Sequence, residues 1–282
     1  MNKIISLFAA CVLLVCLSCA NRSPENAGCN ITTYSVNQQI KKISKIYLCP
    51  PDSVYGEGVR LYYKRSANVQ FITEIEGKVP DVLQDSVIAI AFDEKGVNID
   101  GAMQNFVTSI GDYLDTPSDD LVEITTVPSD SNARILYDNI DVSIPYLSDK
   151  VVVCEISYSG YSGGAHGYYG SRYINYDVKN NKLLNFDDIF IPGCEDELMA
   201  IVVHRLMRDY GTTTMEDLAN ASGIFTEALF LSENVYFTDK GITFYYNPYD
   251  IGPWAIGSIE VNTYLSEIMP YLTLSAQLCF ND

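Results

Sequence analysis

Residues 150–178 of this 282-residue chain read KVVVCEISYSGYSGGAHGYYGSRYINYDV. The segments Lys150–Tyr158 and Ser171–Val178 are rich in β-branched and aromatic residues, which suit the pleated surface of a sheet. Between them lies the loop Ser162–Gly167, SGGAHG, in a stretch with four glycines in eight residues. Because glycine adopts the backbone angles that tight turns need, we predict a β-hairpin with this loop at its tip.

Further strand and helix patterns precede this hairpin. Apolar runs or two-residue alternation predict strands at Val59–Tyr63, Val69–Ile75, Val87–Phe92 and Asp141–Pro145. We expect the first two strands to pair across a turn at Lys64–Asn68. A helical pattern covers Ala102–Leu114, and Asp100 is placed to cap it.

The part of the chain after the hairpin begins with the clearest helical pattern, Glu195–Tyr210. Its apolar stripe recurs every fourth residue, at Leu198, Val202, Leu206 and Tyr210. Thr213 and Glu216 have the spacing of a capping box and predict the start of a short second helix. The remaining predicted elements are strands at Val235–Phe237, Ile242–Tyr246 and Ser258–Val261, and a helical stretch that starts near Tyr264 and ends before Pro270.

The order of these elements predicts the fold class. Strands and helices come in blocks, without regular β-α-β alternation, which favours an α+β fold of mainly antiparallel sheets with packed helices. We expect two closely joined subdomains, over residues 51–145 and 146–282. A signal peptide over residues 1–18 and a tether with an N-terminal segment over residues 19–50 would precede them.

The first residues predict export. A basic start at Met1–Lys3 and an apolar run from Ile4 to Leu17 form the core of a signal peptide, because a membrane-spanning helix needs about 20 apolar residues. Ser18 before Cys19 resembles the lipobox of bacterial lipoproteins, so Cys19 would be lipidated after cleavage. The alternative is an ordinary secretory signal. We expect a cell-envelope, extracytoplasmic protein that contacts the membrane through its lipid anchor only.

Charge and cysteine content narrow the function classes. The formal net charge of −18 excludes a nucleic-acid partner, because an acidic surface repels phosphate, and it permits cationic partners. Five cysteines follow Cys19, and the candidate disulfide joins Cys29 to Cys49. Cys154 lies in an apolar run and is expected to pack as a small buried residue. No cysteine and histidine spacing indicates a metal site, and we expect no metal or cofactor.

His166 is one of only two histidines and the main candidate for a functional side chain. In a glycine-rich loop its imidazole could contact a ligand, hold the loop in place or act as a general base. Asp177, on the following strand, could orient the imidazole if the strands fold back. His204 lies on the polar face of the predicted helix at Glu195–Tyr210 and is expected to be solvated.

The second notable loop is Tyr245–Ala255, YYNPYDIGPWA, which holds the only tryptophan. Rigid aromatic loops are common in recognition, because flat rings cover a large area at small entropic cost. Such a loop can also close the end of a sheet. The chain has no GxSxG motif and no Cys/His pairing, so no nucleophile is indicated.

Two stretches together carry a family resemblance. They are Tyr161–Gly167 followed by Asn175–Leu184, and Phe237–Ile251 with its Asn-Pro-Tyr-Asp motif. In this order they resemble the extracytoplasmic module of the RsiV anti-sigma factor, which is shared with the N-terminal region of the peptidoglycan deacetylase PdaC. The resemblance implies a PdaC-like first subdomain, an RsiV-like second one, and binding of lysozyme. Sigma regulation and deacetylation do not carry over, since we find no segment for either.

We therefore expect a non-catalytic lipoprotein module that binds a cationic protein such as lysozyme, or a cell-wall glycan. One alternative is an envelope hydrolase in which His166 acts beside Asp177 or Asp250, and another is a structural partner in an envelope complex. No catalytic residue is assigned for the binding module. The candidate ligand-binding residues are Tyr161, Gly163, Gly164, His166, Asp177, Tyr249 and Asp250.

Overall fold

The computed structural model describes residues 34–50, 58–110, 121–127, 129 and 132–280. The predicted signal peptide, the tether and the lipidation site Cys19 lie outside these residues, as does Cys29. Within them, no helix has the length and apolar character needed to cross a membrane.

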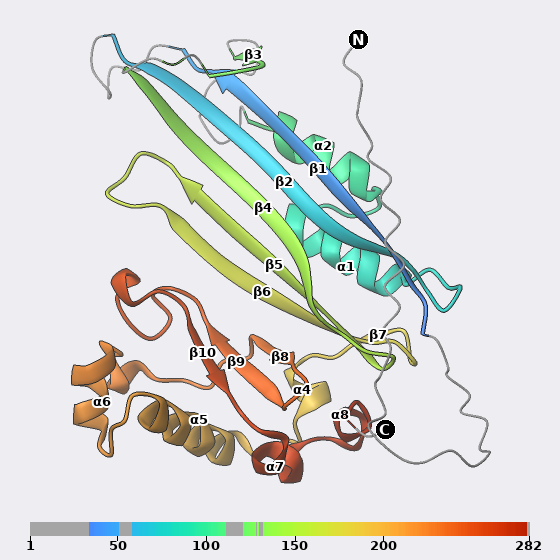
Figure 1. Cartoon of the computed structure of the whole chain (residues 1–282), viewed down its shortest axis with the longest axis vertical. Coiled ribbons are helices and arrows are strands. Elements are labelled where there is room, and N and C mark those ends of the chain that lie inside the picture. Colours follow the sequence, from blue (N-terminus) through green and yellow to red (C-terminus); the bar gives the residue numbers. More distant parts are fainter. Residues whose placement is uncertain (1–33, 51–57, 111–120, 128, 130–131, 281–282) are drawn as a thin grey trace, which may run out of the picture.

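A seven-stranded sheet extends along the length of the molecule, with strand order β3-β1-β2-β4-β5-β6-β7 (Figure 1). Neighbouring strands are antiparallel except β2 and β4, which run parallel. The helices α1 and α2 lie between these two strands in the chain. The strands are β1 Val36–Leu48, β2 Arg60–Ile75, β3 Val122–Ile124, β4 Ala133–Leu147, β5 Val151–Tyr161, β6 Tyr168–Asp177 and β7 Lys182–Leu183. The boundary that we expected after residue 145 lies within β4, so both expected subdomains contribute strands to this sheet.

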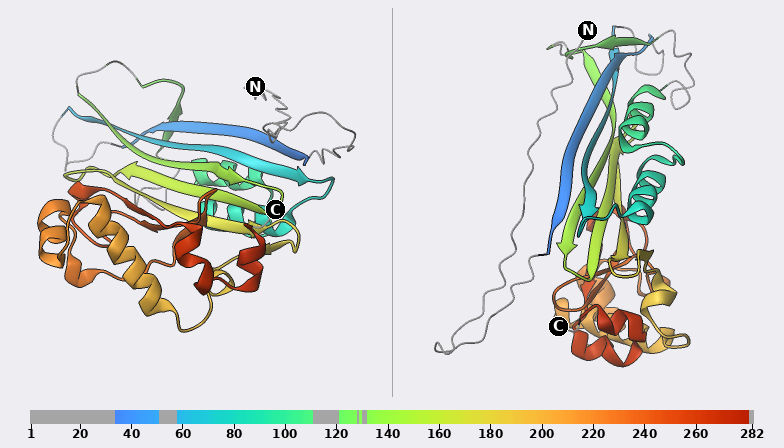
Figure 2. Two further views of the ribbon diagram at one scale, coloured as in Figure 1. Left: turned by 60° about the horizontal axis from the view of Figure 1, so that its bottom comes forward. Right: turned by 90° about the vertical axis from the view of Figure 1, so that its right-hand side faces the viewer.

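Helices α1 (Asp81–Phe92) and α2 (Ile99–Thr108) cover one face of the large sheet (Figure 2). The opposite face of β5 and β6 is covered by a small antiparallel sheet of order β10-β9-β8 and its helices. The elements of this second layer are α4 Phe186–Ile189, α5 Glu195–Asp209, α6 Met215–Ser222, β8 Val235–Phe237, β9 Ile242–Tyr246, β10 Ile259–Asn262, α7 Leu265–Ile268 and α8 Leu274–Leu278.

The apolar run of β5 is explained by burial on both faces. Val152, Cys154 and Ile156 belong to the core that includes residues of α1 and α2. Val151 and Val153 belong to the core that the small sheet and α5 complete. Because successive strand residues point to opposite faces, the part of β5 that lies between the two layers, Val151–Cys154, is apolar at each position.

Several predictions are confirmed. The hairpin of β5 and β6, the helix α5 and the strands β8, β9 and β10 lie where the sequence predicted them, within one to three residues at their ends. Leu198, Val202 and Leu206 of α5 are buried as expected, whereas Tyr210 is 40% exposed. The short helix α6 begins one residue later than predicted, because Thr214 and not Thr213 accepts the capping hydrogen bond, from the Asp217 amide.

Two predictions in the first half are wrong. Val87–Phe92 is not a strand but the end of α1, which begins at Asp81 directly after Pro80. The buried side of this helix is formed by Leu83, Val87, Ile88 and Ala91, whereas Ile90 of the apolar run is exposed. The expected turn at Lys64–Asn68 is also absent: β2 is one continuous strand, whose antiparallel partner is β1.

Helix α2 is shorter than predicted and starts earlier. Its N-cap is Asn98, not Asp100, and the Asn98 side chain accepts a hydrogen bond from the Gly101 amide at 2.8 Å. Leu114, the predicted last residue of this helix, lies outside the described residues.

The cysteines of the described part of the chain, Cys49, Cys154, Cys194 and Cys279, are buried free thiols. Of the disulfide that we considered, Cys49 is therefore a free thiol, and Cys29 is outside the described residues. Burial raises the pKa of the Cys154 thiol to about 12, which matches its expected role as a small apolar residue.

Candidate functional site

The SGGAHG loop and the second loop, Tyr245–Ala255, meet at His166. The His166 imidazole stacks on the Trp254 ring with 4.3 Å between the ring centroids and 18° between the planes. Its Nε2 atom lies 3.1 Å from the Tyr249 hydroxyl, and its Nδ1 atom lies 2.7 Å from the Gly167 carbonyl oxygen. Because a carbonyl only accepts, Nδ1 donates, and in the neutral imidazole Nε2 then accepts from Tyr249.

The SGGAHG loop follows Tyr161 and takes its shape from glycine. Gly163 has a φ of +94°, which other residues rarely adopt. The Tyr161 hydroxyl closes the turn by donating to the Gly164 carbonyl oxygen at 3.0 Å. At Gly167 a Cβ atom would lie 2.7 Å from the Gly160 carbonyl oxygen, so the two ends of the hairpin approach too closely for a side chain.

Asn247 attaches the second loop to β6. Its Oδ1 atom accepts from the Ser171 amide at 2.7 Å, and its Nδ2 atom donates to the Ser171 carbonyl oxygen at 3.3 Å. Asn234 makes the same kind of contact beside it, with the Tyr173 amide at 3.0 Å and the Ser171 carbonyl oxygen at 2.9 Å. These side chains satisfy the edge of β6 at Ser171 and Tyr173, which β7 does not reach.

Tyr249 is the most unusual residue of the site. Its φ is +75°, and its side chain is 64% exposed. Positive φ strains a bulky residue, and such strain concentrates at functional sites because the surrounding structure must enforce it. The constraint comes from the neighbours of Tyr249: Asp250 Oδ2 accepts from the Asn247 amide at 2.7 Å, and the Asp250 amide donates to the Asn247 carbonyl oxygen at 3.1 Å.

Further aromatic side chains on this end of the molecule are exposed to solvent. Tyr169 lies edge-on to Trp254, with 6.2 Å between the ring centroids. We call the His166, Tyr169, Tyr249 and Trp254 side chains the recognition surface. Next to it, Tyr158 and Tyr168 are 42% and 39% exposed. Burial, and then the nearby Asp250 carboxylate, raise the pKa of Tyr158 above its ordinary value.

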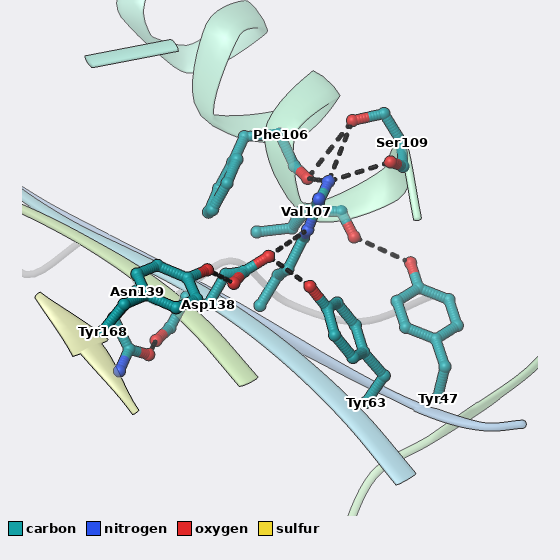
Figure 3. Close-up of polar contacts among 10 residues, drawn as sticks. Tyr47, Tyr63, Phe106, Val107, Ser109, Asp138, Asn139 and Tyr168 are labelled. Atoms are coloured by element: carbon teal, nitrogen blue, oxygen red, sulfur yellow. Dashed lines mark hydrogen bonds and ion pairs between the residues drawn. The ribbon is translucent and has the colours of Figure 1, made fainter. Parts of the chain in front are cut away.

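A polar cluster lies around Asp138 on the α2 side of the sheet (Figure 3). Asp138 of β4 accepts hydrogen bonds from the hydroxyls of Tyr63 and Tyr168. Arg65 Nε is 3.4 Å from Asp138 Oδ2, and the side chains of Arg65 and Asp138 are 9% and 12% exposed. No sequence motif marks these residues, which lie on three strands far apart in the chain.

Asp177 is not part of the recognition surface. It lies at the last position of β6, paired with Lys182, whereas His166 precedes the first position of that strand. Its carboxylate accepts from the Asn180 amide and side chain at 3.0 and 2.7 Å. The strand runs away from the loop and does not fold back, so Asp177 cannot orient the imidazole.

The hydrolase hypothesis requires a carboxylate at His166. Among the described residues, neither imidazole nitrogen has a carboxylate within hydrogen-bonding distance. No group of three or more potential metal ligands occurs in that part of the chain. His204 is exposed on α5, away from the recognition surface.

The sequence pointed to both loops but not to several of the contacts between them. Trp254 was noted as the only tryptophan, yet nothing in the sequence paired it with His166. Asn247 was part of the Asn-Pro-Tyr-Asp motif but had no predicted partner, and Asn234 carried no prediction, although an asparagine side chain can bind backbone groups. Register, which decides that Ser171 faces Asn247, is not visible in the spacing of residues.

Comparisons with known proteins agree with this fold. A model of the family described as "Protein of unknown function (DUF3298)" matches residues 187–262. No curated protein is similar enough to count as a match.

A DUF3298 family structure from Bacteroides fragilis has a TM-score of 0.68 and 23% identity, over 86% of this chain and 96% of that chain. One from Pseudomonas aeruginosa has a TM-score of 0.54 and 16% identity, over 85% of this chain and 96% of that chain. At these identities the likeness concerns the fold. Residues 187–262 thus match the DUF3298 family model, and the chain has an α+β fold that is similar to the fold of solved DUF3298 proteins.

Proposed function

We propose that this protein is a non-catalytic binding module of the bacterial cell envelope, anchored through lipidated Cys19, and that the recognition surface binds a basic protein such as lysozyme. The observation that carries the proposal is Tyr249, a strained and 64% exposed aromatic residue that the structure holds next to His166 and Trp254. Tyrosine and tryptophan dominate the energetics of protein interfaces, because they bury a large rigid surface.

The charge around the recognition surface supports a basic partner. The segments that pack against the second loop carry the exposed acids Glu227 and Glu233, and the loop itself carries Asp250. The Phe225 amide donates to the Ile251 carbonyl oxygen, which places Glu227 close to that loop. Together with the net charge of −18, these acids would steer a cationic protein toward the site.

The resemblance to the RsiV module also supports lysozyme as the partner. A cell-wall glycan is the second candidate, favoured by exposed flat rings such as Tyr169 and Tyr249, on which a sugar ring can stack. Both candidates use the same surface, so one set of variants tests both.

The test is a biosensor measurement of the exported chain against hen lysozyme, at low and physiological salt. A soluble peptidoglycan fragment is the second ligand, and an acidic protein of similar size is the control. We expect lysozyme binding that weakens with salt. Tyr249→Ala and His166→Ala should each lower the affinity at least about tenfold, as expected when an interface anchor is removed. Tyr210→Ala, at the end of α5, should leave the affinity unchanged.

Absence of lysozyme binding at low salt, with binding of the glycan, would replace the first candidate by the second. Absence of both, or equal affinities for wild type and the Tyr249→Ala variant, would refute the proposed function of this surface.

A further inference from the structure

The polar cluster around Asp138 lies between helix α2 and Tyr168, the residue that follows the SGGAHG loop (Figure 3). At the helix end, the Arg65 guanidinium donates through Nη1 to the carbonyl oxygens of Phe106 and Ser109, at 3.0 and 2.8 Å. These carbonyls lie at the C-terminus of α2, where a cation satisfies the last acceptors of a helix and opposes its dipole. Arg65 also lies over the Phe106 ring, 5.0 Å from its centroid.

Arg65 requires a buried counter-charge, and Asp138 supplies it. The two side chains are almost fully enclosed, and the guanidinium and carboxylate are 3.4 Å apart. A buried charge is tolerated when it is paired and hydrogen-bonded. Because Arg65 is held by α2 and paired with Asp138, the Asp138 carboxylate has a fixed place in the sheet.

One hydrogen bond joins this carboxylate to the end of the SGGAHG loop. Tyr168 is the first residue of β6, directly after Gly167, and its hydroxyl donates to Asp138 Oδ1. Its ring lies over Gly160, the cross-strand neighbour of Tyr168. A Cβ atom on Gly160 would lie 2.3 Å from the Tyr168 ring and 2.7 Å from Asp138 Oδ1, so only glycine leaves room for this contact.

We propose that Arg65, Asp138 and Tyr168 are positioning residues for the recognition surface: they hold the SGGAHG loop so that His166 stacks on Trp254. The inference rests on the proposed function for its effect on ligand affinity. It assigns a role to the part of the chain that precedes residues 187–262, because β2, β4 and α2 together provide the point to which the loop is attached.

The test uses Trp254 as a reporter, since it is the only tryptophan of the chain and His166 lies against it. An imidazole in contact with an indole ring quenches its fluorescence. His166→Ala therefore sets the unquenched emission. The obvious variant, Asp138→Asn, leaves Arg65 buried without a counter-ion and can unfold the chain, so the principal variant is Tyr168→Phe, which removes one hydroxyl.

Tyr47→Phe is the matched control. The Tyr47 hydroxyl also donates one hydrogen bond inside the protein, to the Val107 carbonyl oxygen of α2 at 3.0 Å and not to Asp138. We expect Tyr168→Phe to recover most of the emission increase of His166→Ala, and Tyr47→Phe to keep the wild-type emission. The affinity for lysozyme should fall about fivefold to tenfold in Tyr168→Phe, the equivalent of one hydrogen bond, and stay unchanged in Tyr47→Phe.

Wild-type emission in Tyr168→Phe, or equal increases in Tyr168→Phe and Tyr47→Phe, would overturn the positioning role. If the emission changes as expected but wild-type protein binds neither lysozyme nor glycan, the proposed function fails and the positioning role stands. The two ideas are thus tested separately.

Discussion

The two loops of the recognition surface are held in opposite ways. The second loop is fixed by its own side chains: Asn247 binds both backbone groups of Ser171, and Asp250 binds the Asn247 amide. The SGGAHG loop has one internal side-chain bond between non-neighbouring residues, from the Tyr161 hydroxyl to Gly164, and its remaining contacts lead outward, to Tyr249 and Trp254.

This difference indicates that the second loop is rigid, which we call the platform, and that the conformation of the SGGAHG loop depends on its neighbours, so we call it the cover. A loop that carries its own hydrogen bonds keeps its shape when its neighbours change, whereas a glycine-rich loop adopts the shape that its contacts impose. Tyr249 can be strained because Asn247 and Asp250 hold the backbone on both sides of it. His166, in contrast, depends on Trp254 and on the hairpin below it.

Removing Asn247, which attaches the second loop to β6, should have the largest effect on stability. Asn247→Ala removes the partner of the buried Ser171 amide, whereas the Ser171 carbonyl oxygen keeps its bond from Asn234. Together with the lost attachment of the second loop to β6, we expect a loss of about 2–4 kcal/mol in the free energy of unfolding. Asn37→Ala, which removes an exposed 3.3 Å bond to Glu74, should change it by less than about 0.5 kcal/mol. Urea unfolding measures both, and equal losses would show that Asn247 is no special anchor.

In the SGGAHG loop, an added side chain should destabilise the protein at Gly167 but not at Gly164. Gly167→Ala places a Cβ atom 2.7 Å from the Gly160 carbonyl oxygen, and overpacking of this kind costs about 1–3 kcal/mol. At Gly164 the nearest atom to an added Cβ is 3.9 Å away, and φ is not positive, so Gly164→Ala should be neutral or stabilise by up to about 1 kcal/mol. Thermal unfolding compares the two variants, and a larger loss for Gly164→Ala would contradict this account of the loop.

At Tyr249 we expect a small gain in stability. Tyr249→Gly relieves a positive φ that costs about 1–2 kcal/mol in a residue with a Cβ, against about 0.5–1 kcal/mol of added chain entropy in the unfolded state. The net expectation is a stabilisation of about 0.5 kcal/mol in urea unfolding, together with weaker ligand binding. Destabilisation by Tyr249→Gly would mean that the ring packs more tightly than its 64% exposure indicates.

Local sequence patterns predicted helices and strands correctly where the pattern fitted only one kind of element. The α5 stripe and the β5 and β6 hairpin combine length, periodicity and turn residues, and both are confirmed. The run Val87–Phe92 was ambiguous, because a short apolar run suits a buried strand as well as a segment of a packed helix. Pro80 before Asp81 marks the helix start, seven residues ahead of the run.

For the candidate site, the sequence nominated the two loops, and the structure brings His166 and Tyr249 together. It places Asp177 at the far end of β6. Spacing along a strand is not spacing in the fold: residues of one extended strand separate by about 3.3 Å at each step, so Asp177 could approach His166 only if the strand turned back.

The sequence by itself determined the fold class, the glycine-rich hairpin, the acidic charge and the aromatic second loop, because each depends on residues that are near neighbours or on simple sums. Only the tertiary structure decided that His166 stacks on Trp254, that Asn247 clamps Ser171 and that Arg65 pairs with Asp138. These contacts join residues from separate elements, and the register of strands and the packing of layers set them. No local pattern encodes either one.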